Sequence, residues 1–436
     1  MTNLNDSIPD RYPAQMTDCT LQSWQELGMG EMLIQMELSF TERLDPVRLD
    51  RAYRLLLDAE PVLGCGMVVD LPNAWWQRLP AGHPAAIVLA VTEEDYLRFR
   101  DSSIDACKGP QVRIGLWNAA EGDRLLIKVA HQAADAGGAK DVAAILADIY
   151  TKLGNQPDYR PLPNVAGSRG PDQLLRQLPL SARVSIFFLF LRKTLASMIP
   201  YRSQMLPLPD GPHTPWSYTT RHFPPDRTKR MASYGRERNA TLNDLVSAAF
   251  YRSLAKCSDW DGKKALRLFT TLDFRRWYLS GERAEAVCNL SGFEWLFIQR
   301  RLGRNFDETL ARVSALSRKH KAHYPGLADV PMFKVIEKKN YAGIKRFHEG
   351  LVKWIRSTGT NGVALTNMGA IIPERVTFGT AVPREAYLLV PPIHAPLFGI
   401  GMSGYAGTLT LTSGVTETTR PMIERFFDGM LEELPK

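Results

Sequence analysis

The stretch Arg124–Ile149, RLLIKVAHQAADAGGAKDVAAILADI, predicts a buried strand, a sharp turn and a helix. Its first part, Leu125–Ala130, is a short apolar run with β-branched members, which is typical of a buried strand. His131 follows at the end of this run, and Ala136–Gly138 supply the turn. We therefore expect His131 to face a cleft while the core fixes its backbone. From Lys140 onward the apolar residues recur at helical spacing, at Val142, Ala143, Ile145, Leu146, Ile149 and Tyr150.

Length and composition predict a globular protein with two lobes. At 436 residues the chain is too long for one ordinary core. Its 44% hydrophobic and 23% charged residues are typical of a folded, water-soluble protein. The segment 154–172 is rich in Pro, Gly and Asn and is expected to be a linker. We expect an N-terminal lobe over residues 1–180 and a C-terminal lobe over residues 181–436.

Cysteine usage and charge narrow the functional classes. The five cysteines are scattered and form no C-x-x-C, which argues against a disulfide framework or a zinc site and favours the cytoplasm. The N-terminus lacks an apolar signal core, so we expect no secretion. The net charge of +8 suits an anionic partner, but no basic stripe interleaved with aromatic residues is present. We expect a monomer that binds no nucleic acid.

The apolar run Val184–Leu191 has two interpretations. Its eight residues, between Arg183 and Arg192, fall far short of the ~20 that a membrane span needs. One interpretation is a buried helix that connects the lobes. The other is an interfacial segment that contacts a membrane or a lipid substrate.

Periodicity and turn residues predict the remaining elements. A helix over 239–256 begins at Thr241, with Asp244 completing a near capping box. Further helices are expected over 45–59, 306–323 and 418–434. Strands are expected over 32–40, 62–69, 85–90, 110–117, 218–223, 266–272, 290–298, 362–368, 376–380, 386–390, 398–403 and 407–413. We expect the strands from 376 onward to complete one sheet.

Several phrases resemble the acyltransferase superfamily built like chloramphenicol acetyltransferase. That superfamily includes the condensation domains of nonribosomal peptide synthetases, wax-ester synthases, polyketide-associated acyltransferases and alcohol acetyltransferases. The first phrase is H-x-x-x-D, formed by His131 and Asp135 on the predicted strand, turn and helix. The others resemble family phrases at 59–64, 240–250, 273–276 and 367–369. A second H-x-x-x-D, formed by His222 and Asp226, has prolines in its spacer and no expected strand–turn–helix context, so we assign the motif to His131.

The resemblance implies a two-lobe α/β fold, in which each lobe is a mixed sheet with helices packed on it, and an active-site tunnel between the lobes. It implies that His131 is the general base, because the pKa of histidine lies near neutrality. For Asp135 two roles are open. It could orient the imidazole as in a triad, or, as in the resembled family, form a structural salt bridge with Arg275. Arg276 is the alternative inward-facing arginine.

Other residues of these phrases are candidates for the site. Asn367 could donate a hydrogen bond near the oxyanion, and Gly137 could border the tunnel. Two positions depart from the family pattern: Ala130 replaces a histidine that often precedes the catalytic one, and Ala136 replaces the glycine that usually follows the aspartate. The plant-type D-F-G-W-G phrase is absent from the sequence, which disfavours the plant CoA-dependent branch.

The implied function is acyl transfer from an acyl-CoA or acyl carrier protein thioester to a hydroxyl or amine of a small acceptor. The thioester is a co-substrate, and no tightly bound cofactor or metal is expected. One alternative is a stand-alone condensation enzyme that forms an amide between carrier-bound partners. The other is a degenerate relative that binds an acyl ligand or carrier without turnover, which Ala136 favours.

Overall fold

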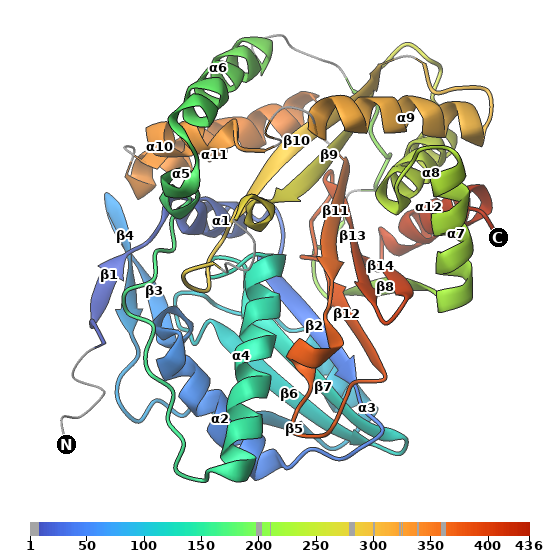
Figure 1. The fold of residues 1–436 in the computed structure, drawn as a ribbon. Coiled ribbons are helices and arrows are strands. Elements are labelled where there is room, and N and C mark those ends of the chain that lie inside the picture. Colours follow the sequence, from blue (N-terminus) through green and yellow to red (C-terminus); the bar gives the residue numbers. More distant parts are fainter. Residues whose placement is uncertain are drawn as a thin grey trace.

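Two lobes, each built on a mixed sheet with helices packed against it, make up the molecule (Figure 1). The computed structural model describes residues 8–197, 203–209, 211–278, 284–299, 301–321, 324, 326–337, 340–358 and 363–436. The predicted fold class, α/β with mixed sheets, is confirmed.

The first lobe contains a five-stranded sheet. In spatial order its strands are β12 (Glu385–Leu389), β2 (Leu33–Ser39), β7 (Gly122–Ala130), β6 (Val112–Ala119) and β5 (Val88–Ala90). Helices α2 (Pro46–Ala59) and α4 (Ala136–Asn155) pack on one face, where Met36, Ile127 and Leu146 belong to one buried core. Helix α3 (Glu93–Arg100) contacts the opposite face, where Phe99 packs with Leu126. A small sheet adjoins this lobe, with the order β1 (Arg11–Pro13), β4 (Asn73–Arg78) and β3 (Cys65–Asp70).

The second lobe contains a six-stranded sheet. Its order is β10 (Ser291–Gln299), β9 (Leu266–Asp273), β11 (Val363–Ala370), β13 (Phe398–Tyr405), β14 (Thr408–Thr416) and β8 (Trp216–Phe223). The rings of Phe250, Phe398 and Phe426 pack together and join the sheet to its two covering helices. These helices are α8 (Leu242–Cys257) and α12 (Arg420–Glu433), flanked by α7 (Pro225–Glu237) and α9 (Phe306–Lys321).

The remaining helices lie on the side of the molecule where the lobes meet (Figure 1). They are α1 (Met16–Glu26), α5 (Asp172–Gln177), α6 (Leu180–Ser197), α10 (Asp329–Glu337) and α11 (Tyr341–Thr358). Three short 3₁₀ helices complete the described chain: η2 (Pro61–Gly64), η3 (Phe274–Trp277) and η4 (Pro373–Val376).

Most predicted elements are present with shifted ends, and three predictions are wrong. Helix α4 begins at Ala136, so Gly137 and Gly138 lie in its first turn and not in a loop before Lys140. The expected strand over 376–380 is replaced by η4 and an isolated bridge between Phe378 and Ala381. Strand β12 does not complete the second sheet, because it pairs with β2 in the first. The lobe boundary at residue 180 remains a prediction. Strand β12 does not follow it, because it comes after residue 180 in the sequence and lies in the sheet of the first lobe.

Helix α6 contains the apolar run whose environment the sequence left open. The helix is confirmed, but among those of its residues whose burial is described, only Ala182 and Ile186 on its inner side are buried. Its outer side exposes Val184, Phe187 and Phe188 to solvent. No helix among the described residues is long and apolar enough to cross a membrane. A peripheral contact with a membrane through this run remains a prediction.

Candidate active site between the lobes

A cavity of about 1330 Å³ lies between the two lobes. The first lobe contributes His131 and the first turn of α4, and the second lobe contributes parts of β9, β10 and β11. Helices α1, α6 and α11 supply much of the apolar and aromatic wall, including Trp24, Phe190 and Trp354. A large, mostly apolar cavity with a few convergent polar groups is the usual form of a ligand site.

His131 directly follows β7 and borders this cavity. Its backbone N–H donates to the carbonyl of Met32 on the neighbouring chain segment, at 2.8 Å. Its ring Nδ1 lies 3.1 Å from the carbonyl oxygen of Ala134. Because a carbonyl can only accept, Nδ1 carries the hydrogen, and Nε2 of the neutral ring keeps the basic lone pair. Burial lowers the pKa of His131, which favours this neutral form.

Asp135 is the N-cap of α4, and its carboxylate is buried in a set of hydrogen bonds. It accepts from the backbone N–H of Gly138 at 2.8 Å, the backbone N–H of Leu290 at 2.8 Å and the hydroxyl of Ser291 at 2.6 Å. It also forms an ion pair with Arg275, with 2.9 Å between Oδ1 and Nη1. Burial alone would raise the pKa of Asp135, but the guanidinium and the hydrogen bonds outweigh burial and lower it to about 2.

The contacts of Asp135 match one of its two predicted arrangements, the salt bridge with Arg275. Its hydrogen bonds run to α4, β10 and η3, whereas the ring Nδ1 of His131 is bonded to Ala134. Asp135 is therefore placed as in the structural salt bridge and not as the orienting member of a triad. It holds the turn that presents His131, and it does so through groups of the second lobe.

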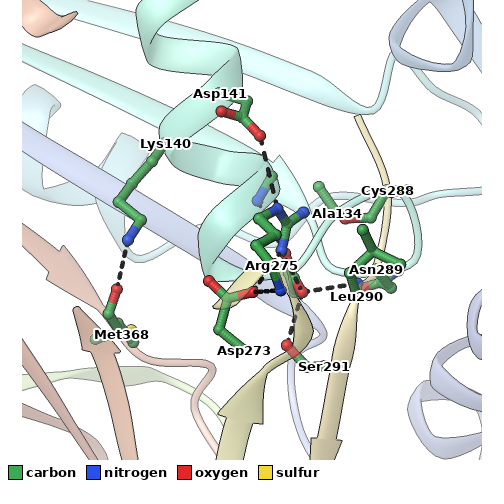
Figure 2. A network of polar contacts seen from close by, with 12 residues as sticks. Ala134, Lys140, Asp141, Asp273, Arg275, Cys288, Asn289, Leu290, Ser291 and Met368 are labelled. Carbon is green, nitrogen blue, oxygen red and sulfur yellow. Dashed lines mark hydrogen bonds and ion pairs between the residues drawn. The ribbon is translucent and has the colours of Figure 1, made fainter. Parts of the chain in front are cut away.

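Arg275 crosses from the second lobe to the motif (Figure 2). Besides Asp135, its Nη1 lies 3.2 Å from Oδ1 of Asp273, and its Nη2 donates to the carbonyl of Cys288 at 3.1 Å. Arg276, the alternative that the sequence left open, instead lies near the ring of Trp277, with 5.6 Å from its Cζ to the ring centroid. Arg275 is thus the inward-facing arginine of the pair.

The guanidinium of Arg275 closely approaches Gly137 and would have to move to admit a side chain there. A Cβ atom at this position would lie 2.3 Å from Nη1 of Arg275, and real Cβ atoms do not approach other heavy atoms so closely. Gly137 also borders the cavity, as predicted from the sequence. Its neighbour Ala136 borders the cavity as well, and its methyl group packs against the first-lobe core.

Two further contacts join the lobes beside the motif. Lys140 of α4 donates from Nζ to the carbonyl of Met368 on β11, at 2.9 Å (Figure 2). Asn289, just before β10, donates from Nδ2 to the carbonyls of His131 and Gln132, at 3.0 and 3.1 Å. These contacts fix the backbone of His131 and of the segment that follows it relative to the second lobe.

Asn367 lies on β11 at the border of the cavity. Its Oδ1 accepts from the backbone N–H of Gly369 at 2.9 Å, and its Nδ2 donates to Oδ1 of Asn243 at 3.3 Å. The strand has a register irregularity between Asn367 and Gly369 where it pairs with β13. Its role at an oxyanion remains a prediction.

The sequence did not single out several residues of the site. Ser291 belongs to a predicted strand that Asn289 directly precedes, and Lys140 belongs to a predicted helix, but their spacing carries no motif. Trp24 and His348 lie on α1 and α11, for which no element was predicted. A buried contact that forms only when distant segments meet leaves no local signal in one sequence. Among the described residues, no group of three or more His, Cys, Asp or Glu side chains could hold a metal ion.

Solved structures with this architecture cover almost the entire chain. The polyketide synthase associated protein 5 from Mycobacterium tuberculosis shares 15% identity and has a TM-score of 0.64, over 96% of this chain and 98% of that one. The first condensation domain of the CDA synthetase shares 17% identity and has a TM-score of 0.67, over 97% and 96%. The EpoB cyclization-docking bidomain from Sorangium cellulosum shares 18% identity, with a TM-score of 0.61 over 98% and 86%.

These likenesses confirm the fold predicted from the sequence. The chain has the two-lobe fold of condensation domains, which is the fold of the chloramphenicol acetyltransferase-like superfamily. No protein-family model matches the sequence, and no curated protein matches it. At identities of 15–18% the comparisons establish the architecture, and the chemistry must be argued from the residues of the site.

Proposed function

We propose that the protein is an acyltransferase that moves an acyl group from a thioester to a hydroxyl or amine of a small acceptor. The observation that carries this proposal is the tautomer of His131. Its Nδ1–H is held by the carbonyl of Ala134, so Nε2 is the basic nitrogen of a ring that borders a cavity shared by both lobes. A condensation-domain-like fold supports transfer of an acyl or peptidyl group.

In the proposed step His131 is the general base, and all atoms and protons are accounted for. Nε2 takes the proton from the acceptor O–H or N–H as the acceptor oxygen or nitrogen attacks the thioester carbonyl. The new C–O or C–N bond forms, the C–S bond breaks, and the imidazolium returns the proton to the departing thiolate. The products are an ester or amide and a free thiol, and no oxidant or metal is consumed.

The donor is proposed to be a phosphopantetheine thioester, either acyl-CoA or an acyl carrier protein. Both present the same thiol on a phosphopantetheine arm, so the chemistry of the cavity does not distinguish them. The net charge of +8 suits either anionic donor. A carrier protein offers an extended acidic face, so its association should weaken steeply with salt, whereas CoA should depend on a few local phosphate contacts.

Release of free thiol tests the proposal. Purified protein should release thiol from an acyl-CoA only when a hydroxyl or amine acceptor is present, and His131→Ala should abolish the release. Turnover with carrier-bound donor alone, slowed sharply as salt rises to ~0.5 M, would favour the second candidate, a stand-alone condensation enzyme. The likeness to condensation domains is the observation that supports this candidate. Donor binding without any thiol release would identify a non-catalytic relative.

A further inference from the structure

A second histidine borders the same cavity, on an element that does not contribute to the motif. His348 lies in the middle of α11, and 6% of its surface is exposed. Its Nδ1 lies 2.6 Å from the hydroxyl oxygen of Ser23 on α1. This pair ties α11 to α1 at the cavity wall.

The hydrogen bonds of Ser23 fix the tautomer of His348. The hydroxyl of Ser23 donates to the carbonyl of Thr20 at 2.8 Å. A hydroxyl has one hydrogen and a carbonyl can only accept, so both contacts are hydrogen bonds at once only when Oγ of Ser23 accepts from the ring. Nδ1 of His348 therefore carries the hydrogen, and Nε2 of the neutral ring has a free lone pair.

The surroundings of His348 keep the ring neutral. Trp24 lies against it with 5.8 Å between ring centroids, Phe347 with 5.5 Å, and Leu351 and Trp354 border the cavity nearby along α11. Burial lowers the pKa of His348 to about 4. At any working pH near neutrality the ring is an acceptor set in an apolar, aromatic wall.

We propose that His348 forms a binding subsite for a substrate whose apolar part carries a hydrogen-bond donor, such as a hydroxyl or an amide N–H. The aromatic wall binds the apolar part, and Nε2 of His348 accepts from the donor. A site that supplies one acceptor in apolar surroundings discriminates strongly against an analogue that lacks the donor, because the acceptor would then be left without a partner. This subsite deepens the proposed function, on whose cavity it rests, and it is separate from the base at His131.

Binding of two matched probes, without any thioester, tests the subsite independently of catalysis. The probes are 1-octanol, which can donate a hydrogen bond, and its methyl ether, which has the same chain and cannot. Calorimetry should show that 1-octanol binds at least about tenfold more tightly than the ether, as expected for one buried hydrogen bond. The ¹⁵N signal of Nε2 of His348 should shift on addition of 1-octanol and not on addition of the ether.

Three variants locate the preference. His348→Leu should abolish the preference for 1-octanol, His348→Gln should keep part of it because the amide oxygen can accept, and His222→Leu should leave it unchanged. If His348→Leu fails to fold, the ¹⁵N measurement on the unaltered protein still decides the question. Equal affinity of the unaltered protein for the two probes, or a preference that survives in a folded His348→Leu, would overturn the proposal.

Discussion

The pattern H-x-x-x-D occurs twice in this chain, and the two copies differ in what approaches them from elsewhere in the fold. His131 and Asp135 lie between β7 and α4, whereas His222 lies near the end of β8 and Asp226 in the first turn of α7. Both copies therefore have a strand–turn–helix context. The expectation that only the first copy has this context is wrong.

The difference lies in tertiary contacts. Asp135 is buried and bonded to α4, β10 and Arg275, so two lobes converge on one carboxylate. Asp226 is an exposed residue in the first turn of α7. His222 is exposed on β8, with its Nδ1 3.1 Å from the hydroxyl of Thr410, and it is outside the set of described residues that border the cavity. The tertiary contacts of the histidine and aspartate therefore distinguish the two copies of the motif, and their local secondary structure does not.

Matched substitutions in the two copies should differ most in their effect on turnover. His131→Ala should lower the rate of acyl transfer by ~10²–10⁴, which is the typical contribution of a general base. His222→Ala should leave the rate unchanged, because its side chain is outside the cavity wall. Thiol release under saturating donor and acceptor measures both. A His131→Ala protein that keeps more than about half of the turnover would contradict the assignment.

The next effect is on stability. Asp135→Ala should lower the free energy of unfolding by about 3 kcal/mol, near the lower end of the range for breaking a buried ion pair, because Asp273 still faces Arg275. Asp226→Ala should change it by less than about 0.5 kcal/mol, as an exposed substitution does. Denaturant unfolding of the two variants makes the comparison. An unchanged stability of Asp135→Ala with loss of activity alone would instead support the triad-like role.

The residues changed in these variants lie in elements that the sequence alone could predict, whereas several contacts around them could not be predicted. The sequence predicted the apolar run of β7, the helical spacing of α4 and the motif between them, because these patterns are local. The pairing of Asp135 with Arg275 was predicted from the family resemblance. The bonds of Asn289 to the carbonyl of His131, and of Ser23 to His348, join segments more than a hundred residues apart. Such contacts depend on tertiary packing, which leaves no periodicity to detect.

A third, smaller effect is expected where Arg275 crosses the motif. Gly137→Ala places a methyl group 2.3 Å from Nη1 of Arg275, so the guanidinium must move and its ion pair with Asp135 must weaken. We expect a loss of about 1–3 kcal/mol in the free energy of unfolding, the usual cost of overpacking. Gly350→Ala is the matched control. Apart from its own helix, no atom of the described residues lies within 4 Å of its added Cβ, and alanine favours the helix, so stability should rise by up to about 1 kcal/mol.

A still smaller effect is expected on the pH dependence of turnover, which should depend on the ionisation of His131 and not on that of His222. Burial lowers the pKa of His131 below its usual value of 6.5, and the base works in its neutral form. The rate should therefore be constant near neutrality and fall only as pH drops below 6.5. The plot of kcat/KM against pH reports this ionisation in the free enzyme. His222→Ala should leave the profile unchanged, and a midpoint above pH 6.5 would contradict the assignment of His131 as the base.

The smallest effect is expected at Ala136, the residue that departs from the family pattern. Its methyl group borders the cavity but also packs against the first-lobe core, so only part of the methyl surface is available to a bound acceptor. Ala136→Gly should therefore change kcat/KM by no more than about threefold. Glycine in the first turn of α4 should lower the free energy of unfolding by less than about 1 kcal/mol. If Ala136→Gly instead raises turnover tenfold or more, the methyl group obstructs the acceptor. If the unaltered chain releases no thiol and Ala136→Gly does, the chain is the degenerate relative and this one methyl group is the reason.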